Sequence, residues 1–258
     1  MITAGIDMGA AFAKMVIVKD GELIGKGICK VTLEPEEAVR TVQELALKDA
    51  GVRPDEIQRV GATGAGRKLV KNADVVVTDV TADAAGANYL DKAVRTVIDV
   101  GGEEARAVKI NEEGKVISFA VNDKCAAGAG AFIEAMTRAL ELPMEDFAKY
   151  SLKSTQKIPI NAQCAIFAES EVVSLINEMT PREDICRAVH DGISDRVSSM
   201  AKRVGIEEKV VLIGGTAKNI GLLKSLEDAL GMKITVLPDP EFVSALGIGI
   251  LAAKDSEN

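Results

Sequence analysis

Two cysteines stand in segments that could hold an iron–sulfur cluster. Cys125 lies within Asn122–Gly130 and Cys164 within Asn161–Glu171, and each precedes a stretch typical of a helix start. The partial positive charge at a helix N-terminus stabilises a thiolate and an electron-rich cluster. A four-iron cluster normally takes four cysteines, so two per chain predict a cluster shared by two chains across a symmetry axis. Two buried apolar cysteines are the other interpretation.

Two aspartates, Asp7 and Asp99, occupy equivalent points of two similar segments. Gly5–Gly9 and Ile98–Gly102 each contain a strand ending, an aspartate, one further residue and a glycine. A glycine turn lets backbone N–H groups approach phosphate oxygens, and a carboxylate beside it can hold Mg²⁺ directly or through water. A single Asp-x-Gly motif is weak evidence for a phosphate site. Two at equivalent points of a repeat predict a phosphate site in which both aspartates are catalytic and hold Mg²⁺.

A third glycine-rich segment, Gly214–Asn219, follows a predicted strand. Glycine lets a backbone approach a bound molecule closely, so this segment could receive the base or ribose of an adenosine group. An ordinary strand-to-helix turn is the other interpretation. The loop Ala62–Arg67 lies between the halves of the repeat and offers Thr63 and Arg67. We predict nucleotide contacts for Gly9, Lys14, Gly64, Arg67, Gly101, Gly102, Gly214, Gly215, Lys218 and Asn219.

The hydrophobic patterns that must position these motifs occur twice. The first copy predicts a three-stranded meander, a helix at Pro35–Gly51 and a strand at Ile57–Gly61. The second copy begins with another meander. A duplicated unit implies an α/β fold of two similar halves with a cleft between them. The other predicted strands are Ile2–Asp7, Ala13–Lys19, Glu22–Val31, Thr96–Gly102, Ala105–Ile110, Lys115–Val121 and Lys209–Ile213, and the other predicted helices are Gly130–Leu140, Ala165–Glu178, Arg182–Val204 and Val243–Lys254.

Bulk composition narrows the class of protein. The 258 residues can form one large domain or two smaller ones, and 47% hydrophobic with 27% charged residues is typical of a soluble globular protein. A net charge of −8 argues against binding nucleic acid or an anionic membrane through bulk electrostatics. Without a leader sequence or an apolar run of about 18 residues, we expect a cytoplasmic protein.

The remaining cysteines and the single histidine fit structural roles. Four cysteines without a secretory signal do not indicate a disulfide framework. Cys29 and Cys186 lack small neighbouring residues, so we expect them to be structural. His190 falls in a predicted helix, and we expect it at the helix surface or an interface, with no catalytic role.

The motifs around Asp7, Ala62–Arg67, Asp99 and Gly214–Asn219 together resemble those of the actin, sugar-kinase and heat-shock ATPase superfamily. Within it, the segments around the two cysteines resemble a narrower group. That group contains the activators of 2-hydroxyacyl-CoA dehydratases and the ATP-binding subunits of ATP-dependent benzoyl-CoA reductases. The resemblance implies two ribonuclease-H-like (actin-like ATPase) domains with a nucleotide cleft between them. We place the first at residues 1–92, joined by a C-terminal helix at about 243–258, and the second at residues 93–242.

The resemblance also implies the cofactors and partners. Cys125 and Cys164 of each subunit would ligate one [4Fe–4S] cluster at the interface of a homodimer, or of a heterodimer with a related subunit. Members of the group use Mg²⁺, ATP and its hydrolysis to ADP to push single electrons from ferredoxin or flavodoxin onto a partner that acts on a CoA ester. Closure of the cleft around ATP is then expected to change the cluster potential or the docking of that partner.

Two phosphate loops depart from the superfamily pattern. The first loop commonly has Ser or Thr after its Asp-x-Gly, whereas Ala10–Lys14 contains no hydroxyl. Phosphate contacts must then come from backbone N–H groups and from Lys14. The second loop has Glu103 and Glu104 where activators typically have Gln and Asp. Glu103 could still position water, which makes it the third catalytic candidate. These departures favour the benzoyl-CoA-reductase type, in which a related subunit could share the work.

Four functions are compatible with these residues. The leading prediction is an ATP-hydrolysing iron–sulfur electron-transfer subunit of the benzoyl-CoA-reductase type. The first alternative is the activator of a 2-hydroxyacyl-CoA dehydratase. A small-metabolite kinase on the same fold is a distant alternative, and it leaves the cysteine motifs unexplained. A non-catalytic ATP-binding protein with a redox-sensing disulfide is the last.

Overall fold

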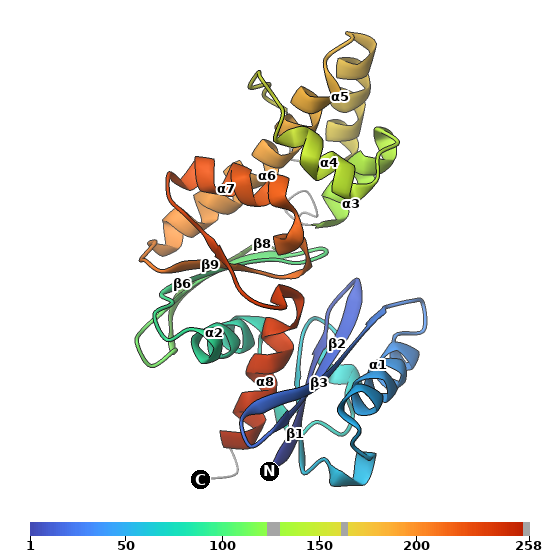
Figure 1. The fold of residues 1–258 in the computed structure, drawn as a ribbon, viewed down its shortest axis with the longest axis vertical. Helices are drawn as coiled ribbons and strands as arrows, with labels where there is room; N and C mark the ends of the chain where they lie inside the picture. Colours follow the sequence, from blue (N-terminus) through green and yellow to red (C-terminus); the bar gives the residue numbers. More distant parts are fainter. Residues whose placement is uncertain (123–129, 161–164, 255–258) are drawn as a thin grey trace.

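The computed structural model describes residues 1–122, 130–160 and 165–254, and two five-stranded sheets lie along the long axis of the molecule (Figure 1). In each sheet the central strand pairs antiparallel with the strand that follows it and parallel with the strand on its other side. The two sheets therefore share one topology, and the predicted duplicated α/β fold is confirmed. The first sheet contains β1 (Ile2–Met8), β2 (Phe12–Lys19), β3 (Glu22–Lys30), β4 (Arg59–Thr63) and β5 (Val75–Val76) in the order β3-β2-β1-β4-β5, and the second contains β6 (Thr96–Val100), β7 (Ala105–Ile110), β8 (Val116–Asn122), β9 (Val210–Ile213) and β10 (Thr235–Val236) in the order β10-β9-β6-β7-β8.

The first meander and the helix after it are fixed by local sequence. Asp20 and Gly21 both have positive φ, as the two-residue turn between β2 and β3 requires. Helix α1 (Pro35–Ala50) begins with a proline and is followed by Gly51 in the left-handed conformation, which closes the helix. Its apolar face packs against the first sheet through Ala38, Val39, Val42 and Ala46.

Two helices separate the sheets. Helix α2 (Asp79–Leu90) packs on the second sheet and α8 (Val243–Lys254) on the first. Their backbones touch where they cross, because a Cβ at Gly86 or at Gly247 would lie about 2 Å from a carbonyl oxygen of the other helix (2.1 and 1.9 Å). The first sheet with α1 and α8 forms the first lobe, and the second sheet with α2 and the other helices forms the second. The domain boundary at residues 92 and 93 stays a prediction.

The other α-helices belong to the second lobe, and those labelled α3, α4 and α5 in Figure 1 lie at its far end. The core beneath them is largely aliphatic, with Phe132 and Phe147 among its largest fully buried side chains. The sequence predicted α3, α5 and α6 but not α2, α4 or α7. Their bounds are α3 (Gly130–Ala139), α4 (Met144–Ser151), α5 (Ala165–Asn177), α6 (Arg182–Val204) and α7 (Ile220–Leu230).

His190 differs from the expectation of a surface or interface position. It is fully buried in α6, with its ring centroid 4.9 Å from that of Phe147 and its Nδ1 2.9 Å from the carbonyl oxygen of Cys186. Burial lowers the pKa of His190 to about 4. The Cys186 thiol is also buried, and burial raises its pKa to about 12. Cys29 donates to the carbonyl oxygen of Ala38 at 3.4 Å.

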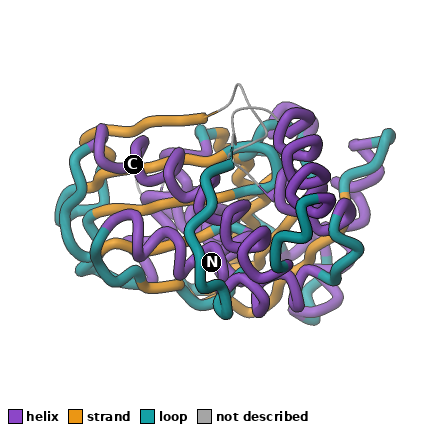
Figure 2. The backbone as a smooth tube through the Cα atoms, turned by 90° about the horizontal axis from the view of Figure 1, so that it is seen from above, coloured by secondary structure: helices purple, strands orange, loops and turns teal. Residues whose placement is uncertain are grey.

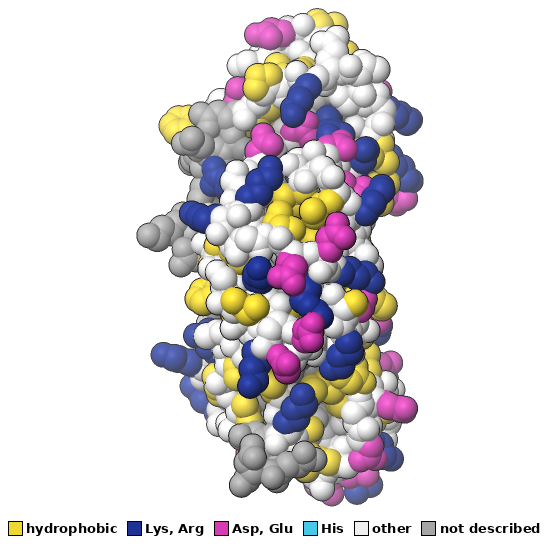
Figure 3. All heavy atoms as spheres, turned by 90° about the vertical axis from the view of Figure 1, so that its left-hand side faces the viewer, with side chains coloured by type: hydrophobic (Ala, Val, Ile, Leu, Met, Phe, Trp, Pro, Cys, Tyr) yellow, Lys and Arg dark blue, Asp and Glu magenta, His cyan; other side chains and the backbone are white. Residues whose placement is uncertain are grey.

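The start of the chain and the end of α8 lie at the same end of the molecule (Figure 1). When the molecule is viewed from above, helices lie in front of strands of the sheets (Figure 2). On the face shown in Figure 3, basic and acidic side chains are interspersed. In the described part of the chain, no helix combines the length and the apolar character needed to cross a bilayer.

Candidate functional site

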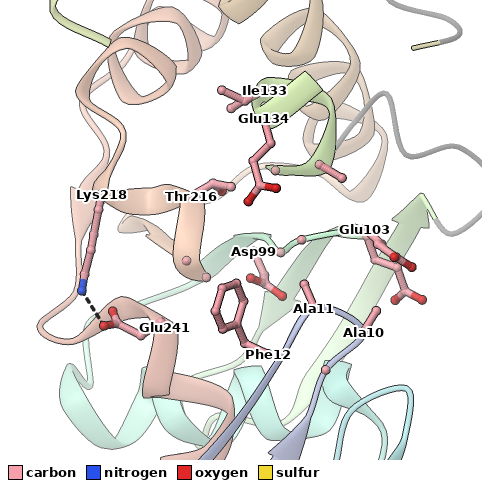
Figure 4. Close-up of a pocket in the computed structure, with 18 of the residues that line it drawn as sticks. Ala10, Ala11, Phe12, Asp99, Glu103, Ile133, Glu134, Thr216, Lys218 and Glu241 are labelled. Carbon is pink, nitrogen blue, oxygen red and sulfur yellow. Dashed lines mark hydrogen bonds and ion pairs between the residues drawn. The ribbon is translucent and has the colours of Figure 1, made fainter. Parts of the chain in front are cut away.

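A cavity of about 1000 Å³ lies between the lobes and brings most of the predicted site together. Its walls include the turns after β1 and β6, the segment after β9, and residues of α3 and α4. Figure 4 labels residues of the two turns, of the segment after β9 and of α3. Of the predicted residues, Asp7, Gly9, Lys14, Asp99, Gly101, Gly102, Glu103, Gly214, Gly215, Lys218 and Asn219 line it.

The first hairpin presents Asp7 and Lys14 opposite each other. They are paired across β1 and β2, and the Lys14 Nζ lies 3.0 Å from Asp7 Oδ2. Asp7 is only 6% exposed. Burial alone would lower the pKa of Lys14, but the charge and hydrogen bond of Asp7, together with the charge of Asp99, outweigh burial and the pKa rises. Without nucleotide, Lys14 is therefore charged and neutralises Asp7.

The second hairpin repeats this arrangement with Asp99 and Arg106, which are paired across β6 and β7. The Arg106 guanidinium binds four carboxylates: Nη2 contacts Asp99, Nε lies 3.2 Å from Asp83, and Nη1 lies 3.1 Å from Glu104 and 3.3 Å from Asp79. Burial raises the pKa of Asp83 to about 8, and Arg106 opposes that rise. Both aspartates predicted from the Asp-x-Gly repeat thus face a cation seven residues further along.

Two glycines fix the aspartates from the side. Gly64 and Gly214 follow β4 and β9, and both have φ near +90° (93° and 89°). A Cβ at Gly64 would lie 2.7 Å from Asp7 Oδ1, and one at Gly214 would lie 2.3 Å from Asp99 Oδ1. These positions were predicted to contact nucleotide. In the structure each is needed for close contact with its aspartate.

The segment after β9 combines structural and open positions. Gly215 has nothing within 4 Å of a Cβ position, so it leaves room for a bound group. The Asn219 side chain accepts from Gly221 N and Leu222 N, both at 3.0 Å, and caps α7. Lys218 pairs with Glu241 (Figure 4). Asn219 and Lys218 therefore already have partners in this structure.

Helices α3 and α4 supply the apolar wall and a carboxylate that the sequence did not reveal. Ile133, Met144 and Ala148 line the cavity, and Glu134 points into it from α3 (Figure 4). The start of α3 is bonded directly to the second phosphate turn. Gly130 N donates to the carbonyl oxygen of Gly101, and Ala131 N to that of Gly102, both at 2.8 Å.

Three other predicted residues are not part of the lining of the large cavity. Arg67 lines a second, smaller cavity and donates to the carbonyl oxygen of Gly64 at 2.9 Å. The Thr63 hydroxyl is buried and has no hydrogen-bond partner among the described residues. Gly64 lies close to Asp7, since a Cβ there would be 2.7 Å from Asp7 Oδ1. Cys125 and Cys164 lie outside the described residues.

The charge of the large cavity fits a metal–nucleotide complex better than a free anion. Eight carboxylates and five cationic side chains line it. No group of three or more His, Cys, Asp or Glu side chains in the described ranges is arranged to hold a metal ion. A Mg²⁺ held by Asp7 and Asp99 would therefore complete its coordination with phosphate oxygens and water, as Mg²⁺ commonly does.

Two equivalent halves, with a nucleotide-sized cavity between their aspartate-bearing turns, define an actin-like ATPase. A glucokinase from Streptomyces griseus, solved with glucose and AMPPNP, shares this fold with a TM-score of 0.61 at 15% identity, covering 98% of this chain and 100% of that one. Residues 4–252 match the BadF/BadG/BcrA/BcrD ATPase family, and the chain belongs to that family.

Its relatives include activators of CoA-ester dehydratases. The chain is 35% identical to the activator of lactoyl-CoA dehydratase of Anaerotignum propionicum, covering 100% of this chain and 99% of the relative. It is 36% identical to the (R)-2-hydroxyglutaryl-CoA dehydratase activating ATPase of Acidaminococcus fermentans, covering 98% and 97%. The activator of the 2-hydroxyisocaproyl-CoA dehydratase from Clostridium difficile, solved with bound ADPNP, superimposes with a TM-score of 0.92 at 32% identity, covering 100% and 97%.

The benzoyl-CoA-reductase type receives less support. A benzoyl-CoA reductase subunit of Thauera aromatica is 28% identical, covering 98% of this chain and 93% of the relative. The comparisons therefore favour the first alternative, the dehydratase activator, over the leading prediction. The hydroxyl-free loop at Ala10–Lys14 and the acid at Glu103 do not outweigh this similarity.

Proposed function

We propose that this chain is the ATP-dependent activator of a 2-hydroxyacyl-CoA dehydratase. The observation that carries the proposal is an identity of 34–36% with three such activators over nearly the whole chain, against 28% with the reductase subunit. In this role the protein takes a low-potential electron from ferredoxin or flavodoxin in the cytoplasm and delivers it to the dehydratase.

The cavity supplies the residues for ATP hydrolysis. Mg²⁺, when bound with ATP, neutralises charge that develops on the phosphates. Asp7 and Asp99 would hold it, and Lys14, which has one carboxylate partner among the described residues, would move from Asp7 to a phosphate oxygen. Glu103 is exposed at the second turn and would orient the attacking water. Gly215 would leave room for the adenosine.

The cluster assignment depends on the cysteine motifs. Cys125 and Cys164 of two chains would supply four thiolates to one [4Fe–4S] cluster, which carries the electron. Helix α5 begins at the residue after Cys164 and exposes apolar side chains, among them Phe167 (67% exposed) and Val173 (46%). Exposed apolar side chains on a helix beside a cluster ligand are suited to contact with a second subunit. This supports a dimer, either a homodimer or a pair with a related chain.

The bonds between α3 and the second phosphate turn offer a route for coupling. The carbonyl oxygens of Gly101 and Gly102 accept from the first two residues of α3. The segment that contains Cys125 ends where α3 begins. A movement of the turn on nucleotide binding would therefore be transmitted to α3, and through it to the cluster ligands.

The test is an anaerobic reconstitution. The protein is mixed with a reductant, Mg-ATP and the dehydratase that co-purifies from its source cells, and dehydration of the 2-hydroxyacyl-CoA substrate is followed. We expect substoichiometric protein to start dehydration, and omission of ATP to prevent it. ATP-dependent reduction of benzoyl-CoA by the co-purified partner would instead restore the reductase assignment. Phosphorylation of a small metabolite, with no iron in the protein, would support the kinase.

A further inference from the structure

A second cavity of about 500 Å³ shares a wall with the nucleotide cavity. Asp79, Glu104 and Arg106 line both cavities. Among the other lining residues are Arg67 of the first lobe and the exposed Thr81 of α2. The ion pairs of Arg106 therefore separate the phosphate end of the nucleotide cavity from a second, solvent-facing space.

The three nitrogens of the Arg106 guanidinium have different roles in the shared wall. Nε and Nη2 of Arg106 bind Asp83 and Asp99, whose side chains are almost completely buried (0% and 3% exposed). Nη1 binds Asp79 and Glu104, whose side chains are 17% and 37% exposed. Two nitrogens thus anchor Arg106, while the third has more accessible partners that another anion can replace.

Arg67 is a second guanidinium on the far side of this wall. Its Nη1 donates to the carbonyl oxygen of Gly64 at 2.9 Å. None of the carboxylates in the described residues forms an ion pair with it. Its positive charge is therefore available to an anion in the second cavity, and its guanidinium shape matches phosphate oxygens.

We propose that the second cavity is the exit for inorganic phosphate. With its phosphates at the two turns, ATP would extend its adenosine past Gly215 and the α3 and α4 side chains that line the cavity. ADP would then lie between the cleaved phosphate and that side of the cavity. Phosphate would leave past Arg106 Nη1, displacing Asp79 and Glu104, and then bind Arg67 before reaching solvent. This inference depends on the ATP hydrolysis proposed above. In the wild type phosphate leaves first and ADP second. ADP does not need the second cavity, so with that exit blocked ADP would leave first and phosphate after it.

The first experiment blocks the second cavity in the intact protein. Thr81→Trp places an indole there, and Lys68→Trp is the control, because Lys68 is exposed and lines neither cavity. Single-turnover reactions measure cleavage by acid quench, phosphate release with a fluorescent phosphate-binding protein, and ADP release with a fluorescent nucleotide. In Thr81→Trp we expect unchanged cleavage and ADP release, with phosphate release about tenfold slower than cleavage. Lys68→Trp should match the wild type.

The second experiment uses inorganic phosphate as the probe and does not require a bulky substitution. In Arg67→Gln the inhibition constant of phosphate, measured with ADP present, should rise about tenfold, whereas Lys68→Gln should leave it unchanged. Wild-type phosphate kinetics in both Thr81→Trp and Arg67→Gln would overturn the exit route. So would equal slowing of phosphate and ADP release, because both would then share one exit. Absence of cleavage in the wild-type protein would instead refute the proposed hydrolysis.

Discussion

The two hairpins of the cavity hold their cations with different strength. Lys14 has a single carboxylate partner in the described residues, whereas Arg106 binds four. A cation with one partner can exchange it for a phosphate oxygen, while one anchored by several buried carboxylates stays in place. Lys14 of the first hairpin can therefore move to a nucleotide phosphate, whereas Arg106 of the second hairpin stays in place and holds Asp99.

Removal of either aspartate charge should stop hydrolysis without affecting the iron site. We expect Asp7→Asn and Asp99→Asn each to lower the rate of Mg-ATP hydrolysis by about 10²-fold or more, because loss of one preorganised electrostatic contact has that effect in other sites. Steady-state phosphate release and iron content are the measurements. Asp20→Asn is the control, since that carboxylate is 70% exposed at the opposite end of the hairpin. Hydrolysis at the wild-type rate by either variant would remove that aspartate from the mechanism.

Gly214 should be more sensitive to substitution than another glycine with similar φ. Gly214→Ala and Gly205→Ala both introduce a side chain at positive φ (89° and 85°), at about 1–3 kcal/mol each. Only at Gly214 would the methyl group also meet Asp99 Oδ1, at 2.3 Å, since Gly205 has open space. We expect a lower melting temperature in both variants and a raised KM for ATP in Gly214→Ala alone. An equal KM in the two would mean that Gly214 does not position Asp99.

The sequence identifies the residues of this site that belong to repeated local motifs. It identifies fewer of the site residues that lie outside those motifs. Asp7 and Asp99 are recognisable because each precedes a glycine at the end of a buried strand. The cation paired with each aspartate can also be recognised from the sequence, because each lies seven residues after its aspartate. Of the two, only Lys14 is among the predicted site residues. Asp83 has no such signal, since it reaches the site only through packing of α2 between the sheets. Arg67 lines the second cavity rather than the large one, and a loop sequence does not show which way its side chain points.

At the scale of elements, the crossing of α2 and α8 holds the lobes together. The Ser244 hydroxyl of α8 donates to Asp83 of α2 at 2.6 Å, and Asp83 in turn accepts from Arg106. Helix α2 was not predicted because seven of its residues are buried, so it lacks the one-sided apolar pattern of a surface helix. Helix α7 was also missed, although Asn219 and Gly231 are recognisable caps.

Substitution at the crossing should separate the two helices. In Gly247→Ala the methyl group would lie 1.9 Å from the carbonyl oxygen of Ala82, so we expect destabilisation by about 1–3 kcal/mol, typical of overpacking. Gly249→Ala is the matched control in the same helix, because its nearest neighbour is a side-chain carbon of Val18 at 3.3 Å. Thermal unfolding of both variants measures the difference. Equal melting temperatures would show that the close crossing is not needed for stability.

At the scale of the whole molecule, a cluster ligated by two chains makes assembly and iron content interdependent. We expect Cys125→Ser and Cys164→Ser each to lower iron from about two atoms per chain to near zero, because each removes two of four ligands from a symmetric site. Cys29→Ser and Cys186→Ser should retain iron. Iron analysis after anaerobic purification, with size-exclusion chromatography, measures both properties. Equal iron in all four variants would refute the cluster assignment.

The matching of Asp7, Lys14 and Gly64 with Asp99, Arg106 and Gly214 has a consequence for the origin of the cavity. Two like halves that face each other across one space have the geometry of an isologous pair, in which the same surface serves both partners. ATP has no two-fold symmetry, so its ends must meet different halves. Divergence of the two halves lets each half be fitted to one end of such a ligand. Lys14 in one half and Arg106 in the other are one such difference. A single chain can carry it, whereas two identical chains cannot.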